Sequence, residues 1–398
     1  LGNYGEGDAL QVTGTATITV NAVNDAPVLA LPGESFVNED ATLTFSAATE
    51  NALTVSDPDT YSDSSAIQAT LQLVDDADAA VTDRGTFTLG STADLTFTTG
   101  DGTDDASMVF LGSLTAVNTA LDGLVYTPPA DYNGEVYLKT TIDDQGNTGE
   151  GDALTNDATA GADEVKITVI AYNDGPVITA AATSLEIDED TVITFNAANS
   201  NALSVVDVDY DETTGGLLLT TLSVTNGKLT LNSAADLENN FNFTIGDGTD
   251  DSAMIFQTTE ASLNTALDGM TYTPDADYNE SDGTSTLTLT ISDQGQTGSG
   301  GTLTDTKSIP ITVKAVNDTP VVTLTNEATI DEDNTYTLSA DNGNAITLAD
   351  VDTHESTGTL TVILTTTSGT FTTPNLGADV TIAAGDGIDD ATLTFTGT

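Results

Sequence analysis

The sequence predicts an all-β protein built from tandem Greek-key β-sandwiches joined end to end. Short runs of alternating apolar and polar residues, rich in Val, Ile and Thr, are bounded by Gly, Asp, Asn and Pro, as is typical of strands and turns. A long internal repeat is also present, and it carries about seven such runs per copy, which suits a sandwich.

The repeat is marked by three related tetrapeptides, Asn24-Asp25-Ala26-Pro27, Asn173-Asp174-Gly175-Pro176 and Asn317-Asp318-Thr319-Pro320. Their asparagines are 149 residues apart (24 to 173) and then 144 residues apart (173 to 317). Each tetrapeptide is predicted to be a linker between sandwiches. We therefore expect the end of a preceding repeat at 1–23, full repeats at 24–172 and 173–316, and the start of another repeat at 317–398, within a longer native polypeptide.

Alternation and β-branched content predict the strands of the first full repeat, and the same pattern precedes each linker. One segment differs, since 113–123 begins with a capping serine, ends with glycine and has apolar residues at helical spacing. Its counterpart is 261–269, so one short helix is expected per repeat. The expected strands are 42–47, 66–74, 85–89, 95–98, 107–111, 136–142 and 165–169, with further strands at 16–20 and 309–313.

Composition limits the function. The chain has 63 acidic and 6 basic residues and a net charge of −57. It therefore cannot bind nucleic acid or an anionic membrane surface through a basic patch, and cations are the expected partners. Cysteine is absent, and no apolar stretch is long enough for a membrane span, so any export signal or anchor is expected outside this chain. The single histidine, His354, has no counterpart in the other copies, and we expect no enzyme.

Acidic residues recur in a fixed register. Glu39, Glu189 and Glu332 each precede a predicted strand, and an Asp-x-Asp motif follows each of them after 18 residues, at Asp57, Asp207 and Asp350. Other loop lengths vary between copies while this separation does not. Oxygen ligands that converge on a metal need such a register, whereas a solvated acidic surface does not.

These motifs resemble cadherin repeats, which place a glutamate near the start, then Asp-x-Asp, a late Asp-x-Gly and an Asn-Asp linker. The late motif is Asp144-Gln145-Gly146 and Asp293-Gln294-Gly295. Asp131-Tyr132-Asn133 and Asp277-Tyr278-Asn279 are similar to the cadherin Leu-Asp-x-Glu segment, with Asn in place of Glu. The resemblance covers the whole chain and is closest to the cadherin-like tandem repeats of large bacterial surface proteins, with features of proteoglycan-type repeats. It implies Ig-like sandwiches and Ca²⁺ at the linkers.

The resemblance also implies the calcium ligands, residue by residue. The first linker would use Asn24, Asp25, Asp57, Asp59 and Asp144; the second Glu39, Asp131, Asn173, Asp174, Asp207, Asp209 and Asp293; the third Glu189, Asp277, Asn317, Asp318, Asp350 and Asp352; and Glu332 would serve a later one.

Other motifs have plainer interpretations. The loop 100–105 favours an Asp-Gly hairpin turn over a second cation site. The acidic insertion that includes 75–78 and Asp83 occurs in the first copy alone and is expected to be a solvated loop. The Gly-rich segment 149–152 occurs once per repeat, which argues against a β-roll, and the unregistered Lys166, Lys307 and Lys314 argue against an isopeptide bond.

The leading functional hypothesis is a calcium-rigidified stalk of a large secreted or cell-surface adhesin, which is extracellular and, as the resemblance implies, bacterial. Its partners would be neighbouring repeats of the same polypeptide and, at a distance, a host or matrix receptor. Two alternatives remain open: a subunit of a self-assembling filament, sheath or biofilm fibre in contact with other copies, and a carbohydrate-binding module, which 5% aromatic content and no Trp disfavour.

Overall fold

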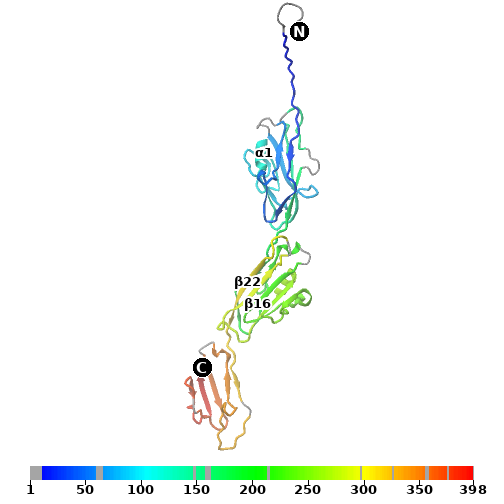
Figure 1. The fold of residues 1–398 in the computed structure, drawn as a ribbon. Helices are drawn as coiled ribbons and strands as arrows, with labels where there is room; N and C mark the ends of the chain where they lie inside the picture. The colour runs from blue at the N-terminus through cyan, green and yellow to red at the C-terminus, as the bar shows by residue number, and fades with distance from the viewer. Residues whose placement is uncertain are drawn as a thin grey trace, which may run out of the picture. The chain divides into compact units, whose positions relative to one another are not determined.

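The structure is a computed structural model, drawn as a ribbon in Figure 1, and the chain divides into two compact units. One unit comprises Leu1–Gly175, Asp207–Gly216 and Gln294–Leu303, and the other comprises Pro176–Val206, Leu217–Asp293 and Thr304–Thr398. The described residues are 11–59, 66–146, 149–156, 163–212, 216–295, 298–324, 327–354, 358–373 and 376–397. Residues 1–10, which match 145–154 in sequence, and the side chain of His354 lie outside this description.

The first unit contains a sandwich of a six-stranded and a three-stranded sheet. The larger sheet has the order β2-β11-β10-β5-β8-β7, in which β2 pairs parallel with β11 and the other pairs are antiparallel. The smaller sheet has the order β3-β9-β6, and β1 pairs with β4. The strands are β1 Val28–Ala30, β2 Ser35–Asn38, β3 Leu43–Phe45, β4 Thr54–Ser56, β5 Ala66–Val74, β6 Thr86–Thr88, β7 Thr96–Thr99, β8 Ser107–Ser113, β9 Leu124–Thr127, β10 Gly134–Asp143 and β11 Glu164–Ile170.

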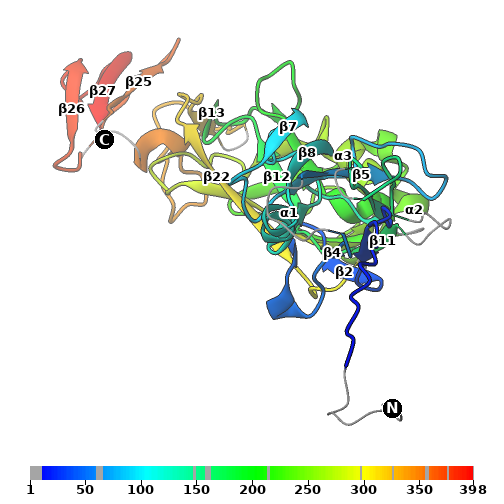
Figure 2. The ribbon, with the colours of Figure 1, turned by 90° about the horizontal axis from the view of Figure 1, so that it is seen from above.

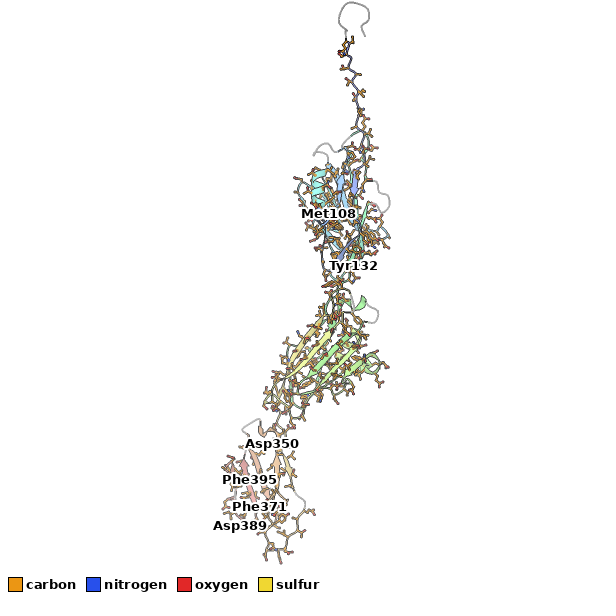
Figure 3. The ribbon with its side chains drawn as sticks, in the orientation of Figure 1. Met108, Tyr132, Asp350, Phe371, Asp389 and Phe395 are labelled. Carbon is orange, nitrogen blue, oxygen red and sulfur yellow. The ribbon has the colours of Figure 1, made fainter. Side chains whose placement is uncertain are left out.

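Alternation along these strands builds the core. Every second residue of β5, β8 and β10 is buried, because successive side chains of a strand point to opposite faces. The buried side chains form one cluster that extends in sequence from Val37 to Val169. Met108 in β8 is fully buried in it, and Figure 3 labels its position.

A short helix, α1 (Leu114–Leu121), follows β8. The Ser113 side chain caps its first turn by accepting a hydrogen bond from the Ala116 amide at 3.1 Å. Val117, Ala120 and Leu121 are buried. Asn118 adds a polar anchor, since its Nδ2 donates to the Val55 carbonyl at 2.8 Å and its Oδ1 accepts from the Val55 amide at 2.9 Å. The helix thereby satisfies the backbone groups of Val55 in β4 on the side where no described strand pairs with it.

The second unit contains a sandwich with the same arrangement, and its core extends from Ile178 to Val313. The six-stranded sheet has the order β13-β22-β21-β16-β19-β18, with β13 parallel to β22, and the three-stranded sheet has the order β14-β20-β17. The strands are β12 Val177–Ala180, β13 Leu185–Asp188, β14 Ile193–Thr194, β15 Leu203–Val206, β16 Leu218–Val224, β17 Gly227–Thr230, β18 Asn242–Ile245, β19 Ala253–Thr258, β20 Thr271–Pro274, β21 Ser285–Ser292 and β22 Thr304–Lys314.

The helix of the second sandwich repeats the first. It is α3 (Glu260–Leu267), capped by Thr259, and Asn264 makes both backbone hydrogen bonds to Val205 at 2.8 Å. The remaining helical turns are η1 Ala47–Thr49, η2 Val208–Glu212, η3 Ser233–Ala235, α2 Leu237–Asn240 and η4 Val351–His354. None of the helices in the described ranges is long and apolar enough to cross a membrane.

The C-terminal part of the second unit has two small sheets. β23 (Val321–Thr323) pairs with β24 (Thr347–Ala349), and β25 (Leu360–Thr365), β27 (Thr392–Gly397) and β26 (Val380–Ala384) lie side by side in that order (Figure 2). Within this segment Leu393 is the one described apolar side chain that is fully buried.

The all-β prediction is confirmed, and most expected elements are found. The expected strand 66–74 coincides with β5, the expected helix 113–123 contains α1, and 261–269 overlaps α3. The expected strand at 16–20 is wrong, since residues 11–22 lie outside any sheet and Ile18 and Val20 are 85% and 87% exposed. Its counterparts β11 and β22 each lie between two partner strands, whereas no described strand pairs with 16–20.

Candidate metal centres at the linkers

The three linkers share one backbone contact. The amide of the linker aspartate donates to the second aspartate of the following Asp-x-Asp motif, at 2.5 Å in Asp25–Asp59, Asp174–Asp209 and Asp318–Asp352. In turn, the first aspartate of each motif accepts a hydrogen bond from the amide of the second, as Asp57 does from Asp59 at 2.8 Å. Asp207 and Asp350 do the same at 3.2 and 3.1 Å. The motif is thus held against the linker in each of the three copies.

The register glutamates approach the linker from the preceding repeat. Glu39 accepts a hydrogen bond from the Tyr172 amide, and Glu189 accepts one from the Val316 amide, in both cases directly before the linker asparagine. Both glutamates are nearly fully buried, with 3% and 4% exposed. The position of each glutamate relative to the linker is therefore set by the main chain.

Asn279 orients the register glutamate at the third linker. Its side chain is fully buried and its Nδ2 donates to Glu189 Oε2 at 3.2 Å, while its Oδ1 accepts from the Ser281 amide at 3.0 Å. With its oxygen used by Ser281, Asn279 acts as a donor that orients Glu189. It supplies no carboxylate of its own.

Carboxylates converge at the second and third linkers. Oxygen atoms of Asp40, Asp131 and Asp174 all lie within 4.8 Å of one another, and so do those of the equivalent Asp190, Asp277 and Asp318. Glu189, Asp318 and Asp352 form a further group with the same spacing. Such groups of oxygens suit a hard divalent cation.

Asp318 belongs to both groups at the third linker, and its environment disfavours the charged form. Burial, together with the negative charges of Asp352, Asp190, Asp277 and Glu189, raises the pKa of Asp318. Its Oδ2 is buried and has no hydrogen-bond partner in the described part of the chain. A cation at this position would relieve both conditions.

The first linker contains a buried amide oxygen, Asn24 Oδ1. Asn24 is 7% exposed, and its Nδ2 donates to Asp144 Oδ2 at 2.7 Å and to the Asp152 carbonyl at 3.0 Å. Its Oδ1 is buried without a hydrogen-bond partner among the described residues. Nearby, burial raises the pKa of Asp57, as do the charges of Asp59, Asp144 and Asp25, although the Asp59 amide lowers it. An unpaired amide oxygen among carboxylates fits calcium, which accepts both kinds of ligand.

The structure brings some of the predicted ligand residues together and leaves others apart. The structure brings together Asn24 with Asp144, Asp25 with Asp59, and Asp131, Asp174, Glu189, Asp277, Asp318 and Asp352 in clusters. Asp293 is buried, whereas Asn317 and Glu332 are exposed, and Glu332 takes part in no cluster found among the described residues.

Asp40 and Asp190 join the clusters although the sequence interpretation did not select them. Both have left-handed backbone conformations, with φ of 60° and 58°, and so do Asp131 and Asp277, with φ of 56° each. Their recurrence next to the register glutamate was the available signal. That signal was ambiguous, because neighbouring side chains in a strand point to opposite faces. Asp40 and Asp190 reach the clusters because their backbones adopt a left-handed conformation.

The Gly-Asp-Gly loop is a turn, as the sequence favoured. Asp105 Oδ2 accepts hydrogen bonds from the Asp101 and Gly102 amides at 2.9 and 2.8 Å. Asp251 and Asp390 do the same in their copies, and Figure 3 labels Asp389 and Phe371 at the last of these turns. The aspartate that recurs at the end of the loop is thus used to hold the loop closed.

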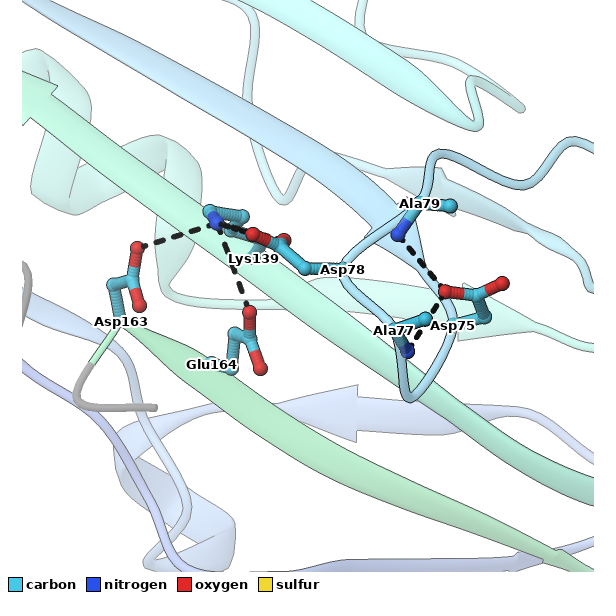
Figure 4. Close-up of polar contacts among 7 residues, drawn as sticks. All are labelled: Asp75, Ala77, Asp78, Ala79, Lys139, Asp163 and Glu164. Carbon is cyan, nitrogen blue, oxygen red and sulfur yellow. Dashed lines mark hydrogen bonds and ion pairs between the residues drawn. The ribbon is translucent and has the colours of Figure 1, made fainter. Parts of the chain in front are cut away.

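The acidic insertion of the first copy is likewise held by its own contacts (Figure 4). Asp75 Oδ1 accepts from the Ala77 and Ala79 amides at 2.9 and 2.8 Å. Lys139 Nζ lies 2.7 Å from Asp78, 3.7 Å from Glu164 and 3.9 Å from Asp163. These pairs join the insertion to β10 and β11.

Cadherin extracellular domains are among the solved structures to which the chain shows similarity, at low identity. No protein-family model and no curated protein matches the chain. Among solved structures, protocadherin gamma B7 extracellular cadherin domains 1–4 are 15% identical with a TM-score of 0.31, over 94% of this chain and 67% of that one. Human CDH23 EC21–23 is 12% identical with a TM-score of 0.32, over 94% and 90%. Because these scores are below 0.5, the fold is assigned from the sheet topology itself: the chain is a tandem β-sandwich repeat protein.

Proposed function

We propose that this chain is a calcium-stiffened repeat region of an extracellular adhesion-type protein, in which the repeats act as a stalk. The observation that carries the proposal is the buried Asn24 Oδ1, which has no hydrogen-bond partner among the described residues and lies on a side chain held by Asp144. A buried acceptor of this kind is unfavourable unless something pairs with it. Calcium is the ligand that suits it together with the surrounding carboxylates.

The linker Asn and Asp and the two aspartates of Asp-x-Asp would hold calcium at all three linkers. The second linker adds the buried Glu39 and the pair Asp40/Asp131, and the third adds the buried Glu189 and the pair Asp190/Asp277. Calcium would supply positive charge and a coordination shell of 6 to 8 oxygens. Without it, carboxylates about 4 Å apart repel by about 4 kcal/mol per pair at an effective dielectric constant near 20. With it, the residues on both sides of a linker are drawn to one ion, which stiffens the linker.

The proposal extends to location and partners. A chain with net charge −57 attracts cations, and extracellular calcium modules bind the ion with dissociation constants of about 10⁻⁴ to 10⁻³ M. The immediate partners are neighbouring repeats of the same polypeptide. A receptor or other copies of the chain would be contacted elsewhere on a longer assembly, and the bacterial surface-protein setting remains part of this proposal.

The test is thermal unfolding of the chain in excess EGTA and across a calcium titration, with small-angle X-ray scattering to follow its length. The variant changes Asp207 and Asp209 to Asn. A matched control changes the exposed Asp76 and Asp83 of the insertion to Asn and removes the same charge. Calcium should raise the Tm and narrow the length distribution of the wild type and the control, and do less for the variant. Equal responses to calcium and magnesium in all three proteins would contradict the proposal.

A further inference from the structure

The Gly-rich segment that recurs once per repeat lies directly against the linker. In the first unit, Glu150 forms a parallel bridge with Val23, donating its amide to the Ala22 carbonyl at 2.8 Å and accepting from the Asn24 amide at 3.2 Å. The segment 298–301 makes the same contacts with the next linker. There Ser299 bridges Tyr172, donates to the Ala171 carbonyl at 3.2 Å and accepts from the Asn173 amide at 2.9 Å.

The same segment also takes up the side-chain amide of the linker asparagine. Asn24 Nδ2 donates to the Asp152 carbonyl, and Asn173 Nδ2 donates to the equivalent Gly301 carbonyl, both at 3.0 Å. Once the nitrogen is used in this way, the Oδ1 atom must point away from the segment. At Asn24 that oxygen is the buried acceptor without a hydrogen-bond partner among the described residues.

The glycines are required by close approach. A Cβ on Gly149 would lie 2.6 Å from the Asn24 nitrogen, and one on Gly298 would lie 2.9 Å from the Asn173 nitrogen and from the Ala171 carbonyl carbon. Both glycines have positive φ, +86° and +61°. Neither backbone can give way without breaking the bridge, so this contact requires the first glycine of each segment.

Asp144 closes the segment at its base. Its Oδ1 accepts hydrogen bonds from the Gly146 and Leu154 amides, both at 2.8 Å, and its Oδ2 accepts from Asn24. Burial follows the same pattern, since Asn24 and Asn173 are 7% and 1% exposed.

We infer that segments 149–152 and 298–301 are linker clamps. They hold the linker by hydrogen bonds in the absence of metal, and they orient the linker asparagine so that its amide oxygen faces the cation. The second half of this inference rests on the proposed calcium function, while the first half does not. Gly149 and Gly298 are thus positioning residues that act through Asn24 and Asn173. Preset ligands bind a metal more tightly than mobile ones, because less ordering accompanies binding.

The test compares Gly298→Ala with Gly149→Ala, so that each variant keeps the other linker intact. Gly369→Ala is the control for backbone strain, since Gly369 has φ +92° and a Cβ there would meet nothing within 4 Å. Hydrogen exchange is measured in EDTA, and calcium binding is measured by isothermal titration. Exchange in the two cores reports whether each variant is folded.

In EDTA, the wild type should protect the Asn173 and Ser299 amides, and Gly298→Ala should lose that protection by about tenfold or more while the first linker keeps it. Calcium affinity at the second linker should fall by about tenfold or more. Fast exchange of these amides in the wild type would overturn the clamp. Lost protection with unchanged calcium affinity would overturn its positioning role.

If the wild type protects these amides but binds no calcium, the clamp holds the linker independently of metal. That result would refute the proposed calcium function and not the clamp. If Gly298→Ala fails to fold, Gly149→Ala gives the same comparison at the first linker. Asn24 and Glu150 are then the amides to follow, with the second linker as the internal reference.

Discussion

Replacing Asp57 by Asn should have opposite effects on stability with and without calcium. Asn is nearly isosteric with Asp and its Oδ1 can still accept the Asp59 amide, which now bonds Asp57 at 2.8 Å. The change therefore removes mainly a negative charge. Asp57 is a buried residue whose pKa is raised by burial and by the charges of Asp59, Asp144 and Asp25.

The magnitude follows from those neighbours. At an effective dielectric constant near 20, two unit charges about 5 Å apart repel by about 3 kcal/mol, and solvent and side-chain motion screen much of it. We expect the calcium-free variant to be about 1–2 kcal/mol more stable than the wild type, which raises the Tm by about 2–8 °C for a domain of this size. In saturating calcium the variant lacks a charged ligand, and a hundredfold weaker affinity removes about 2.8 kcal/mol, which exceeds the gain in the calcium-free state.

The assay is differential scanning calorimetry in EGTA and in calcium, with Asp76→Asn as the control for a general loss of charge. The wild type should be the less stable protein in EGTA and the more stable one in calcium, and the control should not cross over. If Asp57→Asn stabilises equally in both buffers, the carboxylates form only a repulsive surface and the reasoning about this linker is refuted.

Three further predictions concern the pH dependence of Asp57 and the hydrogen bonds of Asn118 and Asp105. Because the pKa of Asp57 is raised in the folded state, protonation of Asp57 stabilises the calcium-free fold. This stabilisation is complete below the unfolded pKa of about 3.8 and is lost as the pH rises through the folded pKa. Urea titrations in EGTA should therefore show the advantage of Asp57→Asn shrinking as the pH falls from about 7 to about 4, and a constant advantage would contradict this. Asn118→Ala should lower stability by about 2–4 kcal/mol in chemical denaturation, since both backbone groups of the buried Val55 lose their partner, whereas Thr119→Ala on the exposed face should change little. Asp105→Ala should cost about 1–3 kcal/mol by opening the turn but leave calcium titrations unchanged, and weaker calcium binding would mean that the turn holds a cation after all.

Local pattern was sufficient for several elements. Period-two alternation located β5, β8 and β10, and the Ser113 cap with helical spacing located α1, because these signals arise within a few residues of one another. The repeated Asn-Asp-x-Pro tetrapeptides likewise identified the linker aspartates, and the fixed register after the glutamate identified the Asp-x-Asp motifs that the structure brings to them.

Other features depended on pairing between distant segments. Strand 16–20 has the same alternation as β11, yet it forms no sheet because a strand needs neighbours to bond its backbone. The parallel pairing of β2 with β11 joins residues about 130 positions apart in sequence, and nothing in the sequence of either strand announces it.

The sequence by itself thus determined that this protein is an acidic array of β-sandwiches with ligand-type residues at its linkers, since periodicity and repetition are properties of the chain alone. Only the tertiary structure decided which oxygens meet. Asp40 approaches Asp174 because its backbone turns left-handed, Asn279 uses its amide to hold Glu189, and the Gly-x-Gly segments grip the linkers. Each of these contacts spans 90 residues or more, so it exists only once the sandwich has closed.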